Sequence, residues 1–418
     1  MAILNSKLEE YFNQKRSIIK LQTIILTAIF TVFIYLGLPS LYQRIIIWSD
    51  GYALGDWLIN YEDGGFKRRG LSGTIFIFLA KSTGIYVGKI VFGFVSLLYI
   101  CFCILLIKIL KQIKFDFNLL VYCCLPTVFL FPINDLFAFG RKEILFLNIF
   151  LFFVYAYDNK DIYSWKFISV LSTILIIATL YHELIVFYVP YLMIVYLFNF
   201  LNKKKGSLSK IAVVGASTFI PAIIIFMFGK DINEGNSWST FKELGVGENV
   251  MKGIFDWPKE GFGKGKVNAL TFAETRNYGL YGISYILTLI VFLSIVVKQN
   301  KCKISIFKIG LIHVGLVILT LPLFFLTIDW GRWLNIHFIC MAFVLLIFYK
   351  KRENNETYSL KSITINSISI LNLIRFSVFT LCIFGFSMDH VDIGFKLGQN
   401  DLLIQIRDLI WNIRHINF

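Results

Sequence analysis

Apolar runs that approach membrane-spanning length recur from one end of the chain to the other. A helix that crosses the hydrocarbon core of a bilayer needs about 20 mostly apolar residues. Hydrophobic residues make up 57% of the sequence and charged ones only 16%, whereas soluble domains average about 45–50% apolar and about 25% charged. The sequence therefore predicts an all-α, polytopic integral membrane protein with about eleven transmembrane helices in a single membrane domain, 1–418. The predicted spans are 19–38, 85–107, 116–132, 144–157, 167–181, 184–201, 211–228, 279–297, 309–327, 334–349 and 369–387.

Lysine-rich connections alternate with chemically richer ones along the chain. Cytoplasmic loops of membrane proteins carry an excess of Lys and Arg. Every second connection, counted from a cytoplasmic N-terminus, is short and dominated by lysine. This alternation predicts a cytoplasmic N-terminus and, with an odd number of spans, an external C-terminus. The lysine-rich connections lie at 108–114, 160–166, 203–210, 298–308 and 350–361.

The opposite connections combine Arg with acids, His, Trp and Gly, which places the predicted functional face outside the cytoplasm. The first long connection, 39–84, contains an amphipathic stretch and an apolar stretch too short to cross, and both suit helices lying in the membrane interface. The second, 229–278, is rich in glycine and is expected to form a loop over a site. The external tail, 388–418, ends in a further amphipathic stretch that predicts an interfacial helix.

The formal charge of +15 does not indicate a nucleic-acid partner. The basic residues stand in short clusters between apolar runs, which is typical of topology signals and of contacts with lipid headgroups. The seven cysteines lie in apolar spans or in a basic loop without metal-type spacing, and we expect them to pack as small apolar residues. No cofactor is predicted, and no motif supports a divalent metal.

The sequence EDGGFKRRG at 62–70 is the most specific polar motif outside the predicted spans. Arginine offers planar, bidentate donors that match phosphate oxygens, and adjacent glycines let the backbone approach an anion. This pattern predicts a phosphate site, although basic residues at a membrane surface also hold headgroups. The candidate phosphate ligands are Lys67, Arg68 and Arg69, and the candidate catalytic acids are Glu62 and Asp63.

The sequence GRKE at 140–143 stands at the external start of a predicted span. A helix N-terminus carries partial positive charge, so Arg141 and Lys142 are candidate ligands of an anion there. An arginine beside the apolar core is costly unless it is paired or used. The alternative is a salt bridge with Glu143 in the first turn.

His182 and Glu183 lie between two apolar spans with almost no loop around them. A His–Glu pair at this depth predicts a general base with its orienting acid. The alternative is a polar network that holds a helix hairpin together. Adjacent residues point to different helix faces, so the pair does not predict a zinc motif.

The sequence DWGRW at 329–333 supplies polar and aromatic candidates between two spans. Arg332 is a candidate phosphate ligand, and Asp329 is a further candidate catalytic acid or base. Trp330 and Trp333 are candidates for stacking on a sugar ring. Tryptophan at an interface also serves as a membrane anchor, and the sequence leaves both interpretations open.

Together these features resemble the membrane glycosyltransferases of the GT-C type and the bacterial O-antigen or capsule polymerases (Wzy-like). The resemblance lies in the layout: many spans, a long first external loop with interfacial helices and acids, and external arginines. It implies that an acid of the first external loop acts as base or metal ligand, and that external arginines hold the diphosphate of a lipid-linked donor. The matching acids are Asp56, Glu62 and Asp63, and the matching arginines are Arg68, Arg69, Arg141 and Arg332.

The resemblance implies a polymerase of lipid-linked oligosaccharide repeat units. Such an enzyme transfers a growing glycan from polyprenyl diphosphate to an acceptor sugar hydroxyl at the external face of the bacterial inner membrane. A GT-C enzyme with a polyprenyl-phosphate sugar donor is the nearest alternative. A lipid-linked oligosaccharide flippase is a third, but charges inside the spans that would line its path are scarce. The expected partners are the lipid-linked substrate, membrane lipids and a chain-length regulator protein.

Overall fold

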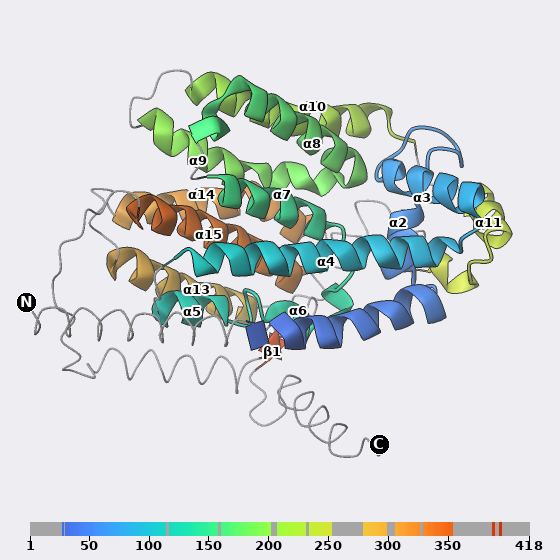
Figure 1. Ribbon diagram of the computed structural model, residues 1–418, viewed down its shortest axis with the longest axis horizontal. Coiled ribbons are helices and arrows are strands. Elements are labelled where there is room, and N and C mark those ends of the chain that lie inside the picture. The colour runs from blue at the N-terminus through green and yellow to red at the C-terminus, as the bar shows by residue number, and fades with distance from the viewer. Residues whose placement is uncertain are drawn as a thin grey trace, which may run out of the picture.

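The computed structural model describes the central part of the chain with several gaps (Figure 1). The predicted span at 369–387 and the tail at 388–418 lie almost entirely outside the described residues, as does most of the predicted loop at 229–278. The described residues are 27–28, 30–113, 117–157, 160–201, 207–230, 234–252, 279–298, 306–326, 329–353, 387–388 and 393–394.

The described residues form a bundle of roughly parallel and antiparallel helices (Figure 1), with one antiparallel pair of two-residue strands, β1 (Ser387–Met388) and β2 (Ile393–Gly394). Five helices among them are long and apolar enough to cross a membrane. These are Phe30–Ile47, α4 (Val87–Lys111), α10 (Ser207–Phe228), α13 (Gly279–Lys298) and α15 (Trp330–Glu353). Further helices in the bundle are α7 (Glu143–Ala156), α8 (Trp165–Tyr181), α9 (Val189–Leu201) and α14 (Ile306–Leu326).

The outer surface of the bundle is apolar. On α10, Ile220 and Ile223 are exposed, and Phe226 leaves 82% of its surface uncovered. A helix with large aliphatic and aromatic side chains on its outer face is expected to contact the hydrocarbon of a bilayer, because a soluble domain rarely exposes a large contiguous apolar patch. By contrast, α15 is almost wholly buried from Trp330 to Ile347, and the helix packs against α7, α9 and α14. These observations agree with the predicted multi-pass membrane protein.

Three predicted spans differ from the observed helices. The predicted span 184–201 is divided into a 3-10 helix, η5 (Glu183–Phe187), and α9. The first helix runs on to Ile47 through a π-helical turn, η1 (Gln43–Ile47), rather than ending at 38. The predicted span 116–132 is broken into α5 (Phe117–Cys123) and α6 (Phe131–Asn134). Pro126 follows the end of α5 and lacks the N–H that a continuing helix would need, so the chain turns there.

One end of the bundle carries additional short elements (right in Figure 1). Here α3 (Gly70–Thr83) exposes Ile75 and Phe78, as expected for an interfacial helix. The backbone N–H of Gly73 in α3 donates to the carbonyl of Ile59 at 3.1 Å, and a Cβ on Gly73 would clash with that oxygen. The elements at this end are η2 (Gly51–Gly55), α2 (Asp56–Leu58), α3 (Gly70–Thr83), α11 (Glu234–Glu243) and η6 (Glu248–Met251).

Candidate functional site

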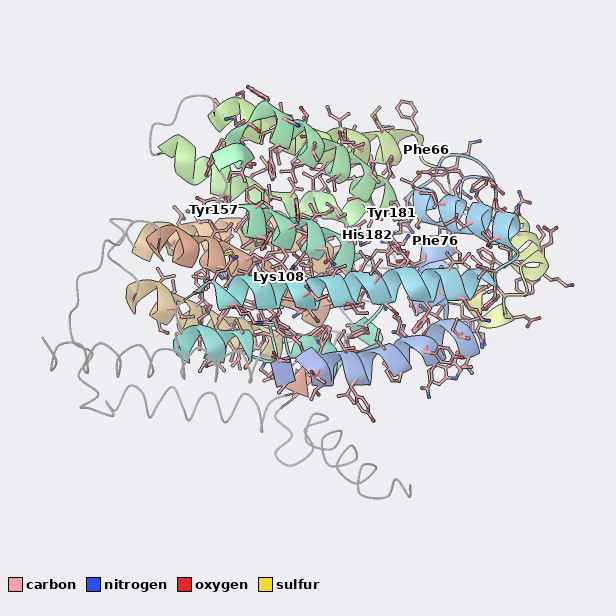
Figure 2. All side chains as sticks on the ribbon, in the orientation of Figure 1. Phe66, Phe76, Lys108, Tyr157, Tyr181 and His182 are labelled. Carbon is pink, nitrogen blue, oxygen red and sulfur yellow. The ribbon has the colours of Figure 1, made fainter. Side chains whose placement is uncertain are left out.

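Four segments that are far apart in the sequence meet at this same end of the bundle. They are the 56–69 loop, the start of α7, the junction between α8 and η5 (Glu183–Phe187), and the start of α15. Figure 2 shows His182 close to α3, whereas Lys108 lies toward the other end of α4. Each segment contains one of the polar motifs identified in the sequence. Their ionic side chains form one buried cluster.

The 56–69 loop is held in a strained conformation. Asp56 begins α2, and Arg69, the residue before α3, has a left-handed backbone with φ of 61°. A non-glycine residue in this region costs about 1–3 kcal/mol and persists where its surroundings over-determine it. Here the ion pairs of the Arg69 side chain supply that constraint.

The start of α7 is fixed by its neighbours before the helix begins. Gly140 has φ of 92°, a conformation that favours glycine. Its N–H donates to the hydroxyl of Tyr99 at 2.9 Å, and its carbonyl accepts from the indole N–H of Trp57 at 2.8 Å. Upstream, the buried guanidinium of Arg44 donates to the carbonyls of Phe137 and Phe139. These hydrogen bonds therefore fix the turn at Gly140 and with it the positions of the three residues that follow.

The first half of the cluster is an alternating chain of cations and carboxylates. Lys142 Nζ lies 3.8 Å from Asp56 Oδ1 and donates to Ser72 Oγ at 2.9 Å. Arg69 bridges two acids: its Nη1 donates to Asp56 at 3.0 Å and its Nε donates to Glu183 at 3.1 Å. The loop, α7 and the α8–η5 junction are thus joined through one arginine.

The second half centres on Glu143, in the first turn of α7. Its Oε1 lies 3.3 Å from His182 Nε2 and 3.7 Å from Arg332 Nε. Arg332 Nη2 also donates to Asp329 at 2.7 Å. Because His182 Nδ1 lies 4.0 Å from Glu183 Oε2, the two halves form one continuous network.

The charges of the cluster hold one another ionised despite burial. Burial alone would raise the pKa of Asp56, but Lys142 and Arg69 outweigh it and hold that pKa below its usual range. Burial alone would lower the pKa of Arg69, but Glu183 and Asp56 outweigh it and raise that pKa. For Lys142 burial prevails over the attraction of Asp56 and lowers the pKa to about 8. Four acids therefore face three cations and His182, and of the three cations Lys142 is more readily neutralised than either arginine.

His182 is the one imidazole of the cluster, and its two ring nitrogens have different surroundings. Nε2 faces Glu143, and a carboxylate can only accept, so we assign the proton to Nε2. Nδ1 is buried and has no hydrogen-bond partner in the described part of the chain. With this tautomer, Nδ1 carries a lone pair that can accept a proton. The sequence predicted a base here with Glu183 as its orienting acid, but the carboxylate closer to the His182 ring is that of Glu143.

An aromatic pocket adjoins the cluster. Its polar lining comes from Arg141, Glu143, Arg332 and Asn335. The walls come from the first helix, α4, the 129–132 segment and α15. Six aromatic rings contribute to the lining: Phe30, Phe33, Tyr99, Phe102, Phe129 and Phe131.

Besides Arg69, four predicted site residues lie between positions 62 and 68, mostly apart from the network. Glu62 pairs with the exposed Lys81 at 3.1 Å. Asp63 accepts from Asn60 and, at 2.7 Å, from Thr240 of α11. Lys67 donates to the backbone carbonyl of Asp63. Asp63 and Lys67 therefore stabilise the conformation of the loop and its contact with α11. Arg68 contributes positive charge near Glu183.

The two predicted sugar-binding tryptophans differ in their surroundings. Trp333 is 1% exposed, and the guanidinium of Arg332 lies over its ring at 4.3 Å. The Trp333 ring packs against the guanidinium of Arg332, and neither face of the ring is exposed for stacking on a sugar in this structure. Trp330 is half-buried, and its indole N–H donates to the carbonyl of Phe324 at 2.8 Å.

Sequence reasoning missed two participants. Glu143 was interpreted only as a salt-bridge partner of the preceding bases, yet it contacts His182 and Arg332 from other helices. Its place in the first turn of an apolar helix was the available signal, because an acid there needs a partner. Tyr188 has a buried hydroxyl near Glu143 and Arg332, without a hydrogen-bond partner in the described residues. No sequence signal distinguished it from a core tyrosine.

Within the described residues, no group of three or more His, Cys, Asp or Glu side chains is arranged to hold a metal ion. Comparison with known protein families, with curated proteins and with solved structures finds no match to this chain.

Proposed function

We propose that the chain is a glycosyltransferase that polymerises lipid-linked oligosaccharide repeat units at the external face of the bacterial inner membrane. The observation that carries the proposal is the buried ionic network, in which four separate segments bring acids, arginines and a histidine together beside an apolar pocket. Charged side chains that are buried inside a membrane protein are energetically expensive, and they mark functional sites. An anionic, amphiphilic substrate matches both parts of the site.

The proposed reaction moves a glycan from polyprenyl diphosphate to a sugar hydroxyl. The acceptor oxygen forms a bond to the anomeric carbon, the bond from that carbon to the diphosphate oxygen breaks, and the electron pair leaves with the diphosphate. Arg141 and Arg332 line the pocket where this negative charge would develop. His182 Nδ1 takes the hydroxyl proton, while Glu143 orients the ring and stabilises the imidazolium. The proton then passes to solvent.

The proposed orientation follows the lysine-rich connections. A cytoplasmic N-terminus directs the first helix outward, so that the starts of α4, α7 and α15 and the end of α8 all fall on the external side. The proposal includes about eleven spans and an external C-terminus. The partners are the lipid-linked repeat unit, membrane lipids and a chain-length regulator protein.

A second candidate is transfer of one sugar from a polyprenyl monophosphate donor. Arg141 favours it, because Arg141, unlike Arg69, Lys142 and Arg332, makes no ion pair with an acid in the described residues. A single arginine without an acid partner, Arg141, matches the charge of one phosphate group more closely than that of a diphosphate. The acceptor chemistry at His182 is the same in both reactions.

A surface-glycan gel of the native bacterium, with the gene deleted and restored, tests the proposal. For a polymerase we expect the ladder to collapse to a band with a single repeat unit, and restoration of the gene to recover the ladder. A ladder that persists with a uniform change in mobility would favour the single-sugar transferase. An unchanged glycan in both length and composition would contradict both candidates.

A further inference from the structure

Two histidines lie inside the bundle, apart from the network of acids and arginines. His313 of α14 and His337 of α15 are almost wholly buried, and His337 Nε2 lies 3.3 Å from His313 Nδ1. His337 Nδ1 is hydrogen-bonded to the buried hydroxyl of Tyr191 in α9, and the hydroxyl of Tyr285 in α13 lies 3.0 Å from His313 Nδ1. Four helices thus contribute to one chain of ionisable side chains. Such groups are costly inside a membrane and mark functional paths.

The chain of hydrogen bonds can run in two directions, because hydroxyl groups and neutral imidazoles both donate and accept. In one direction Tyr191 donates to His337 and His337 donates to His313, which leaves a proton on His313 Nε2. In the other direction His313 donates to His337 and His337 donates to Tyr191, which leaves a lone pair on His313 Nε2. A proton that enters at His313 Nε2, with the release of another from the Tyr191 hydroxyl, converts the second arrangement into the first.

Each end of this chain has a buried polar atom without a protein partner. His313 Nε2 has no hydrogen-bond partner in the described residues. At the other end the ring of Tyr188 lies 6.4 Å from that of Tyr191, and the buried Tyr188 hydroxyl is likewise unpaired within the described part of the chain. A network that only held helices together would pair these atoms, because an unpaired buried polar group is costly. Water is the usual partner of such groups, and water exchanges protons with them.

The chain of side chains leads from the external end of the bundle toward its inner half. The Tyr188 hydroxyl lies near Glu143 of the ionic network. His337 stands seven residues after the external start of α15, which is about 10 Å along the helix. His313 stands seven residues after the start of α14, about 10 Å from the end that the lysine-rich connection 298–308 places on the cytoplasmic side. The two histidines therefore connect the outer and inner halves of the bundle.

We propose that the bundle contains a proton path that runs through four side chains, Tyr188, Tyr191, His337 and His313. Protons pass along it by exchange between neighbouring groups, and water carries them to and from each end. Every proton that enters at one end releases another at the opposite end, so no larger ion crosses. The hydroxyl of Tyr285 holds the His313 ring in place. This activity goes beyond the proposed function, because glycan transfer does not require it.

Proton entry into vesicles that contain the full-length protein tests the path, with a potassium diffusion potential as the driving force and a trapped pH-sensitive dye as the readout. We expect wild type to acidify the interior faster than protein-free vesicles do. His337→Phe, which removes both ring nitrogens, should return the rate to that of protein-free vesicles. A wild-type rate equal to that of protein-free vesicles would overturn the proposal. Entry of Na⁺ under the same potential would identify an open aqueous pore and would also overturn it.

Tyr122→Phe is the matched control, because it removes a buried hydroxyl that donates to the carbonyl of Phe338, next to His337 but outside the path. It should conduct protons as fast as wild type. An equal loss in Tyr122→Phe and His337→Phe would indicate general damage to the packing and contradict the path. If His337→Phe does not fold, Tyr191→Phe removes only the oxygen that contacts His337 and should abolish the flux as well. Full flux in folded Tyr191→Phe would contradict the proposal.

Discussion

Replacing Asp56 by Ala should lower the free energy of unfolding by about 3–5 kcal/mol, the usual cost of leaving a buried ion pair without one partner. Asp56 is the acid nearest to Lys142, whose side chain is fully buried. It also accepts a hydrogen bond from Arg69, which holds a strained backbone conformation. Thermal unfolding of the purified protein in detergent measures the loss.

Glu62→Gln is the control for this prediction. Glu62 belongs to the same loop, but it and its partner Lys81 are each almost half exposed, and such a pair contributes about 0–1 kcal/mol. The Asp56 effect also has a pH signature. Its folded-state pKa lies below the ordinary 3.8, so its stabilisation is complete above about pH 4 and is lost as the pH falls through the lower folded-state value. Equal melting temperatures for Asp56→Ala and Glu62→Gln at neutral pH would contradict the role of the network.

Replacing His182 by Gln should reduce the rate of glycan transfer by about 10²–10⁴-fold, the usual contribution of general acid–base catalysis. The side-chain amide of Gln can still donate to Glu143, so the network should stay folded. However, it has no nitrogen that can accept a proton as Nδ1 of His182 does. Single-turnover transfer from a lipid-linked donor, measured by mass spectrometry, gives the rate.

A merely structural role for His182 would give a different pattern. In that case His182→Gln would lower the melting temperature and weaken binding of the lipid-linked donor together with the rate. The catalytic role predicts a loss of rate with melting and binding unchanged. If His182→Gln retained full activity, a residue other than His182 would have to act as the base.

Much of the fold was predictable because a bilayer imposes simple rules on sequence. Apolar runs of sufficient length form helices, as α4, α10 and α13 do. Polar residues beside such runs stand out because they are costly there. For this reason the EDGGFKRRG, GRKE, HE and DWGRW motifs could be recognised individually, and the structure places members of all four in one network.

The pairing within the network could not be predicted, because it depends on how helices dock. His182 and Glu183 are neighbours in sequence, yet the closer carboxylate of His182 is that of Glu143, from another helix. Adjacent residues at a helix junction point in different directions, whereas docking brings α7 and the α8–η5 junction together. Sequence spacing also gave no reason to assign different roles to Asp63 and Asp56. In the structure Asp63 accepts a hydrogen bond from Thr240 of α11, whereas Asp56 pairs with Arg69.

The most direct test of the central claim is transfer by the purified protein in vesicles supplied with polyprenyl-diphosphate-linked repeat units. Chain length and released polyprenyl diphosphate are followed together by mass spectrometry. A polymerase with this site should form lipid-linked glycans of two or more units and release one polyprenyl diphosphate for each unit joined, and His182→Gln should do neither. Glycans that never exceed one unit, from protein that folds and binds the donor, would contradict the claim.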